Sequence, residues 1–170
     1  MKNNRIKATV IVLLAALFLV LSGFSKAKDE TTSIPFSGRN FSFYGNWEKT
    51  ASDTKFTRYD SGNDFAIVVV GDYDKNLIDS AKDQSMKLAN ALISGLDSVE
   101  IEDPWRTTID DCKAIVVPFN GNKGEIIGRL YCIDDKENDQ SIIIGVAFFD
   151  EHDDDYFESF DNTIAGQNEK

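Results

Sequence analysis

One long helical pattern separates two groups of strand-like segments, and this order constrains the fold more than any other feature of the sequence. Between Lys75 and Leu96 the apolar residues recur at helical spacing on one side, which predicts an amphipathic helix packed on a sheet. A second helical pattern closes the chain. Strand patterns occupy most of the remainder, at residues 40–44, 55–59, 65–70, 99–101, 105–109, 112–119, 125–133 and 141–149.

This order predicts an α+β domain. Strands joined by hairpins on both sides of a single helix favour an antiparallel β-sheet flanked by that long helix and by the C-terminal helix. The continuous apolar run from Phe65 to Val70 predicts a strand that is buried on both faces.

The first residues have the composition of an export signal. A basic segment precedes an apolar run of 14 residues from Ala8 to Leu21, which is short for a membrane span. Ser25 and Ala27 supply the small side chains that a signal peptidase requires, so we expect residues 1–27 to be a cleaved signal peptide and the protein to be secreted or extracytoplasmic. The alternative is an uncleaved N-terminal membrane anchor, because the residues after Leu21 extend the run to about 17, the lower limit for a span. Phe24 occupies the position of the lipid-bearing Cys of bacterial lipoproteins, which excludes lipidation there.

We expect a single folded domain after the leader. Residues 28–39 are polar, small and proline-bearing, which is typical of a flexible linker. Aromatic alternation begins at Asn40 and the last helical pattern ends near Gly166, so the domain is expected to span residues 40–166, with residues 167–170 as a tail. Without its leader the chain keeps 143 residues, enough for one hydrophobic core.

The chain is strongly acidic, which excludes several kinds of partner. Its formal net charge is −11 at pH 7, and the chain without residues 1–27 carries −15, because that segment holds four basic residues and no acidic one. Such a surface repels phosphate backbones and anionic headgroups, so we expect no nucleic-acid binding. Membrane contact is expected only if the N-terminal segment is uncleaved. The expected partner is an unknown protein or envelope component.

Cys112 and Cys132 lie on the two arms of a predicted hairpin and are candidates for a disulfide bond. A register centred on Asn122 places them opposite each other, where the Cα separation suits a disulfide. A tight turn at Asn120-Gly121 would instead place Cys112 opposite Arg129. A disulfide and two buried thiols are both open at this point, because export permits oxidation without requiring it.

The sequence contains no motif of a known catalytic or metal site. His152, the single histidine, lies in the acidic run 150–155 and is interpreted as a solvated surface group. That run lacks the spacing of a calcium loop and precedes the last helix, where carboxylates cap amides. We therefore expect no enzyme, no cofactor and no metal site. The alternative is a secreted hydrolase that uses Asp or Glu side chains.

The element order also resembles that of PsbP-like domains. The resemblance covers about residues 36–165, and it rests on Gly45-x-Trp47 after an aromatic strand, the single long helix, Ile109–Ala114 leading into a meander, and a closing helix with Phe157, Phe160 and Ile164. It implies an α-β-α sandwich and a non-enzymatic role in partner binding or assembly. Photosynthetic members are associated with metal and subunit binding, but no residue pattern here allows those ligands to be carried over.

Together these observations predict an exported binding or assembly module of the bacterial envelope or extracellular space. Exposed aromatic side chains are the usual anchors of protein interfaces, so the candidate binding residues are Tyr44, Trp47 and Trp105. The competing interpretation of these aromatics is that they belong to the core, which is the commoner place for Trp.

Overall fold

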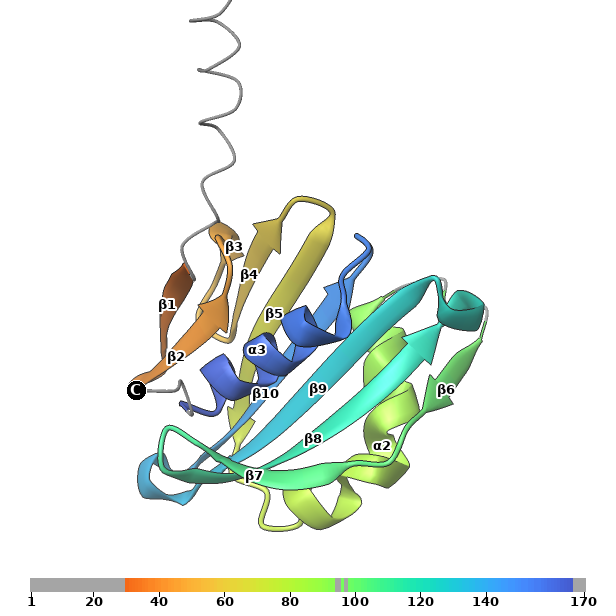
Figure 1. Cartoon of the computed structure of the whole chain (residues 1–170). Coiled ribbons are helices and arrows are strands. Elements are labelled where there is room, and N and C mark those ends of the chain that lie inside the picture. Colours follow the sequence, from red (N-terminus) through yellow and green to blue (C-terminus); the bar gives the residue numbers. More distant parts are fainter. Residues whose placement is uncertain (1–29, 94–95, 97, 167–170) are drawn as a thin grey trace, which may run out of the picture. The chain divides into compact units, whose positions relative to one another are not determined.

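The computed structural model describes residues 30–93, 96 and 98–166, so the predicted signal peptide and the predicted tail lie outside the described residues. The described chain forms mostly antiparallel β-structure with two helices, which confirms the predicted α+β class (Figure 1). None of the described helices combines the length and the apolar character needed to cross a bilayer. In chain order the elements are β1 (Thr31–Phe36), β2 (Arg39–Tyr44), β3 (Glu48–Ser52), β4 (Phe56–Ser61), β5 (Asp64–Asp72), α2 (Leu77–Leu92), β6 (Val99–Ile101), β7 (Trp105–Ile109), β8 (Cys112–Gly121), β9 (Ile126–Asp135), β10 (Gln140–Phe148) and α3 (Asp154–Ile164).

The strands of the described residues form a two-stranded sheet, β1-β2, and a larger sheet with the order β3-β4-β5-β10-β9-β8-β6, in which β7 also pairs with β8. β5 precedes α2 and β10 is the last strand, yet the two pair from Asp72 opposite Gln140 to Phe65 opposite Ala147. This pairing joins the strands that precede the long helix to those that follow it, so both groups belong to one sheet.

The larger sheet has an apolar core on each face, because successive side chains of a strand point to opposite sides. On β8, Ala114 and Val116 belong to the core that α3 and the β1–β2 hairpin complete. Ile115 and Val117 belong to the core that α2 completes. Figure 1 shows α3 in front of the sheet and α2 behind its β8–β9 half. We call these two sides of the sheet the α3 face and the α2 face.

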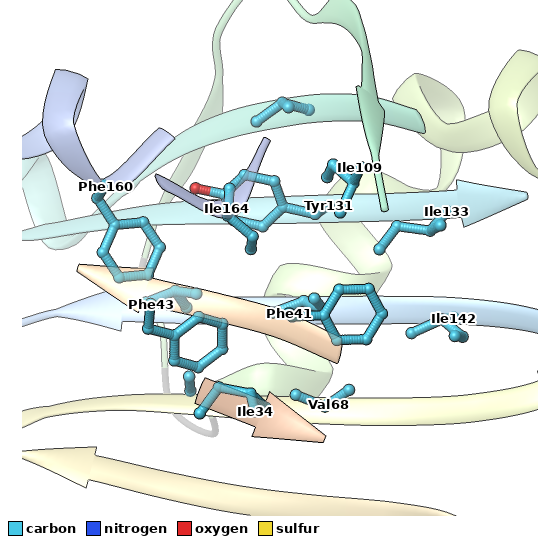
Figure 2. Packing of buried hydrophobic residues seen from close by; sticks show 14 of the residues in the cluster. Ile34, Phe41, Phe43, Val68, Ile109, Tyr131, Ile133, Ile142, Phe160 and Ile164 are labelled. Carbon is cyan, nitrogen blue, oxygen red and sulfur yellow. The ribbon is translucent and has the colours of Figure 1, made fainter. Parts of the chain in front are cut away.

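The folded unit begins earlier than the sequence predicts. Residues 31–36, which we assigned to the flexible linker, form β1 and pair in register with β2. Ile34 is fully buried, and Figure 2 shows it with Phe41 and Phe43 of β2 among core residues of the large sheet. The linker prediction was therefore wrong for this segment. This strand buries a single side chain among polar neighbours. Its alternation of apolar and polar residues is therefore too weak for the sequence to distinguish it from a flexible linker.

An ion pair ties the β1–β2 hairpin to one end of the large sheet. Arg39 donates to Asp135, which also accepts from the side-chain amides of Asn138 at 2.9 Å and Gln140 at 2.6 Å. The Asp135 side chain has no exposed surface. Burial alone would raise the pKa of Asp135, but these hydrogen bonds outweigh it and hold the pKa well below its usual range. The bond to Asp135 in turn raises the pKa of Arg39.

Both helices occupy the predicted segments, and a carboxylate lies at the amino end of each. Asp74 accepts a hydrogen bond from the backbone N–H of Asn76 at 2.9 Å, immediately before α2. Asp153 accepts from the N–H of Tyr156 at 2.9 Å and is the N-cap of α3, so part of the acidic run caps this helix. Gly95, which lies near the end of the helical pattern in the sequence, is outside the described residues.

Candidate functional site

A pocket lies between the β8–β9 turn and the loop that joins β10 to α3, and its volume is about 280 Å³. Both segments that line the pocket bring apolar and acidic side chains to it, and the segment after β10 adds an imidazole. The lining residues are Gly124, Glu125, Ile127, Phe148, Phe149, Asp150, Glu151 and His152. None of these side chains bears a hydroxyl or thiol, so the lining offers carboxylates and an imidazole but no nucleophile of the serine or cysteine kind.

His152 is held in one orientation by a buried carboxylate. Its Nε2 lies 2.6 Å from Oδ2 of Asp64, the first residue of β5, whose side chain is 2 % exposed. Oδ1 of Asp64 accepts from the backbone N–H groups of Phe149 at 2.7 Å and Asp150 at 3.0 Å. The imidazole also stacks on the ring of Tyr156, with centroids 3.9 Å apart and planes 8° from parallel. His152 is therefore not a solvated surface group, and our interpretation of it was wrong.

A second contact joins the same two segments. Asn63, in the β4–β5 turn, donates from its side chain to Oδ1 of Asp150 at 2.6 Å and from its backbone to Oδ2 at 3.2 Å. These hydrogen bonds lower the pKa of Asp150. Gly62 precedes Asn63 with φ of +62°, and a Cβ on it would lie 2.7 Å from Oδ2 of Asp150. Glycine thus permits both the left-handed turn and the close approach of the Asp150 carboxylate.

The sequence carries no signal for this arrangement. Asp64 and His152 are 88 residues apart, and they meet because β5 and β10 are neighbours in the sheet. Burial raises the pKa of the adjacent Tyr156 to about 12, with the charge of Asp64 adding to the effect. Among the described residues, no group of three or more His, Cys, Asp or Glu side chains is arranged to hold a metal ion.

Part of the α2 face is left uncovered. α2 packs on β6, β8, β9 and β10, so neither described helix lies over the α2 face of β4 and most of β5. Val69 of β5 is 40 % exposed and Phe149, just after β10, is 41 % exposed. β5 is therefore buried on one face only, and the prediction that both faces are buried was wrong. We call this surface the open face, and its residues are Phe56, Arg58, Asp60, Phe65, Ile67, Val69 and Phe149.

The residues of the open face form an ordered array. Phe56 lies opposite Val69, Arg58 opposite Ile67, and Asp60 opposite Phe65. Phe149 extends the array beyond Phe65, and their rings stack with centroids 5.9 Å apart. The open face therefore continues to the edge of the pocket, because Phe149 belongs to both.

Only one of the three predicted binding aromatics is exposed. Trp47 is 3 % exposed, and its Nε1 donates to the carbonyl of Tyr44 at 2.8 Å, so it belongs to the core. Tyr44 is half-buried, with its ring 5.4 Å from that of Tyr156. Trp105, on β7, is 39 % exposed and stays a candidate contact residue away from the open face. The binding hypothesis was thus wrong for Trp47.

The strand register excludes the proposed disulfide. Cys132 lies opposite Ile115 on β8, because the β8–β9 turn occupies residues 122–125, further along the chain than either register considered from the sequence places it. Cys112 belongs to the core on the α3 face and Cys132 to the core on the α2 face. Side chains on opposite faces of a sheet cannot be bridged, so both cysteines are buried free thiols.

The fold is that of a PsbP-like domain, an α+β architecture built on an antiparallel sheet with two helices. Among solved structures the chain is similar to cyanobacterial PsbP (CyanoP) from Synechocystis sp., with a TM-score of 0.59 and 11% sequence identity over 82% of this chain and 92% of that chain. This likeness confirms the resemblance found in the sequence, at the level of the fold.

Two further structures show weaker likeness. The Ran-binding protein Mog1p of Saccharomyces cerevisiae has a TM-score of 0.49 and 8% identity over 80% of this chain and 85% of that chain. A protein of unknown function from Pseudomonas aeruginosa, a putative regulator, has a TM-score of 0.37 and 12% identity over 83% and 96%. No protein-family model and no curated protein sequence matches the chain.

Proposed function

We propose that this chain is an exported, non-enzymatic binding or assembly module, arranged as an α-β-α sandwich, that acts in the bacterial envelope or extracellular space. The N-terminal composition supports export, and the strongly negative charge of the remaining chain fits a soluble module with a protein or envelope partner. The PsbP-like fold is compatible with such a role but does not define it.

The observation that carries this proposal is the open face. Apolar side chains in the middle of a sheet are normally covered, and a contiguous apolar surface rimmed by charge is typical of an interaction site. Phe56 and Ile67 are half-buried, while Val69 and Phe149 are exposed by about two-fifths. A partner that covers this surface would bury apolar area that the fold itself leaves in water.

A hydrolase is less well supported by the same geometry. The acids of the pocket come from two neighbouring loops and not from separate strands around a deep cavity. Asp64, the buried carboxylate beside His152, already accepts three hydrogen bonds. Asp64 therefore fixes the loop after β10 and the imidazole of His152 in place.

Partner capture with surface variants tests the proposal. The full chain is expressed with its leader in a bacterial host, and the exported protein is cross-linked to envelope components and isolated. Val69→Gln should reduce recovery of a specific partner several-fold, because it places an amide on the open face. Met86→Gln is the matched control, since Met86 is 52 % exposed on the surface of α2. Equal recovery with both variants would contradict a binding role for the open face.

The export step has its own measurement. Cleavage after Ala27 predicts that the intact mass of the recovered protein corresponds to a chain beginning at Lys28. A mass that includes residues 1–27 in a membrane fraction would support the anchor instead. Full-length protein in the cytoplasmic fraction would contradict export altogether.

A further inference from the structure

The open face is polarised along the strands, and this polarity deepens the proposed function by indicating the chemistry of the partner. At one end Phe56 and Val69 lie opposite each other, with Ile143 of β10 in the same row. At the other end, Asp60 and Phe65 form a row that continues to Glu48 on the edge strand β3. One end of the surface is thus aliphatic and aromatic, whereas the other carries acids.

The acidic end is completed by the loop after β10. Asp150 and Glu151 follow Phe149 directly and line the pocket beside it, together with Glu125 from the β8–β9 turn. Within residues 30–93, 96 and 98–166, none of Glu48, Glu125, Asp150 and Glu151 forms an ion pair with Lys or Arg. Their negative charge is therefore available to a partner.

Arg58, the basic residue of the open face, is already paired with a carboxylate of the same surface. The guanidinium of Arg58 lies 2.8 Å from Oδ1 of Asp60 and 4.6 Å from the centroid of the Phe65 ring. A cation resting on an aromatic ring beside a carboxylate is a favourable arrangement. The exposed ring of Phe149, next to Asp150 and Glu151, offers the same combination to a cation from outside the chain.

We propose that the open face binds a segment of a partner protein in which aliphatic side chains are followed by Lys or Arg. The aliphatic side chains lie over Phe56, Ile67 and Val69. The basic side chains lie at the Phe149 end, against Glu48, Asp150 and Glu151. This inference rests on the proposed function and adds the chemistry of the ligand to it.

Charge decides between this occupant and a second copy of the chain. Two copies that meet through their open faces bring two domains of net charge −15 into contact. Like charges at an interface oppose association, whereas a basic segment complements the acidic end and is steered toward it. The surface therefore favours a basic partner over self-association.

Fluorescence anisotropy with synthetic peptides tests the inference. The probe is a labelled peptide in which Leu and Val alternate with Thr and which ends in a run of Lys. A second peptide replaces the Lys run with Glu, and a third keeps Lys but replaces Leu and Val with Thr. The exported wild-type protein should bind the first peptide at least about tenfold more tightly than either of the others, with affinity that falls as NaCl is raised.

Two double variants with the same change in net charge separate the acidic end from the bulk charge. Glu48→Gln with Glu151→Gln should weaken binding of the first peptide about tenfold. Asp83→Asn with Glu100→Gln, at exposed acids on α2 and β6, should leave the affinity within about twofold. Circular dichroism melts verify that both variants remain folded.

Several results would overturn the inference. Equal binding of the Lys and Glu peptides, or equal loss of affinity in the two double variants, would show that the acidic end has no specific role. A dimer in sedimentation velocity that Val69→Gln abolishes would assign the open face to a second copy. If no peptide binds but cross-linked partner recovery still depends on Val69, the partner chemistry is wrong and the binding function stands. If recovery is also independent of Val69, both the partner chemistry and the binding function of the open face are wrong.

Discussion

Among the described residues, Asp135 and Asp64 are carboxylates almost completely removed from solvent, with exposed fractions of 0 and 2 %. Donors of the protein replace the lost water around both of them. Asp135 accepts from Arg39, Asn138 and Gln140, while Asp64 bonds two backbone amides and His152. Burying a carboxylate without such donors would be strongly unfavourable. Each of these two carboxylates therefore holds together segments that are distant in sequence.

The substitution Asp135→Asn should lower the free energy of unfolding by about 3 kcal/mol, because it leaves a largely buried guanidinium without its buried anionic partner. The pKa of Asp135 is lower in the folded chain than in the unfolded chain, so the pair stabilises the fold above the unfolded value and loses this effect as the pH falls. In urea melts, the difference between wild type and variant should narrow between about pH 5 and pH 2. A difference that stays constant over this range would contradict the ionic role.

Glu137→Gln provides the control for this pair. Glu137 also contacts Arg39, at 2.9 Å, but its side chain is 79 % exposed. An exposed ion pair contributes less than about 1 kcal/mol, so this variant should stay close to wild type. A large effect of Glu137→Gln would show that Arg39 depends on more than the buried partner.

The two cysteines should behave as unreactive thiols. Burial raises the pKa of Cys112 to about 11 and that of Cys132 to about 12, so very little thiolate forms near neutral pH. A chromogenic disulfide reagent should react slowly with the folded protein and should titrate both thiols after unfolding in urea, with or without prior reduction. Loss of titratable thiol in the unreduced sample would contradict the strand register.

At the level of elements, the sequence predicts best the helices and strands whose two sides differ most in polarity. The helix expected at residues 75–96 is found as α2, and the expected closing helix as α3, because apolar side chains recur there at helical spacing. β3 was missed because all of its side chains are exposed, so burial imposes no alternation on it. Edge strands of this kind carry little signal in the sequence.

The β8–β9 register could not be predicted for a different reason. The connection is a short 3₁₀ turn at Asn122–Gly124 in which Asn122 and Lys123 both have positive φ. Asn and Gly recur over residues 120–124 and suit several turn types, so the sequence does not select among them. A change of one residue in the register moves a side chain to the other face, which is why the disulfide hypothesis depended entirely on this turn.

The contribution of β1 is testable by truncating its buried side chain. If residues 31–36 were a tether, Ile34→Ala would have no effect. Because Ile34 is fully buried beneath the hairpin, the substitution should lower the free energy of unfolding by about 3 kcal/mol through lost burial and a residual cavity. Ser33→Ala, at an exposed position of the same strand, should change it by less than about 0.5 kcal/mol. Equal, small effects in urea melts would restore the linker interpretation.

At the level of the whole molecule, the open face follows from a mismatch in width. Strands are spaced about 4.8 Å apart and a helix with its side chains is about 10 Å wide, so a single helix cannot cover the full width of the large sheet. On the α3 face, α3 and the β1–β2 hairpin together cover the sheet, whereas on the α2 face α2 is the one helix that the described residues provide. A sequence with one long helix and many strands therefore predicts an uncovered region, but the strand order decides that it lies on β4 and β5.

The net charge of −15 on the chain after residue 27 adds a destabilising term that acts over the whole fold. Compact folding brings the acids closer together than in the unfolded chain, so screening should stabilise the folded state. Between about 10 mM and 150 mM NaCl the screening length falls from about 30 Å to about 8 Å, and the free energy of unfolding in urea should rise by about 1 kcal/mol.

The double variant Asp83→Asn with Glu100→Gln carries two fewer negative charges and should show a smaller salt effect. Because the Arg39–Asp135 pair is buried, it is screened much less than the exposed acids. A stability that falls with added salt would instead mean that exposed ion pairs outweigh the repulsion among the unpaired acids.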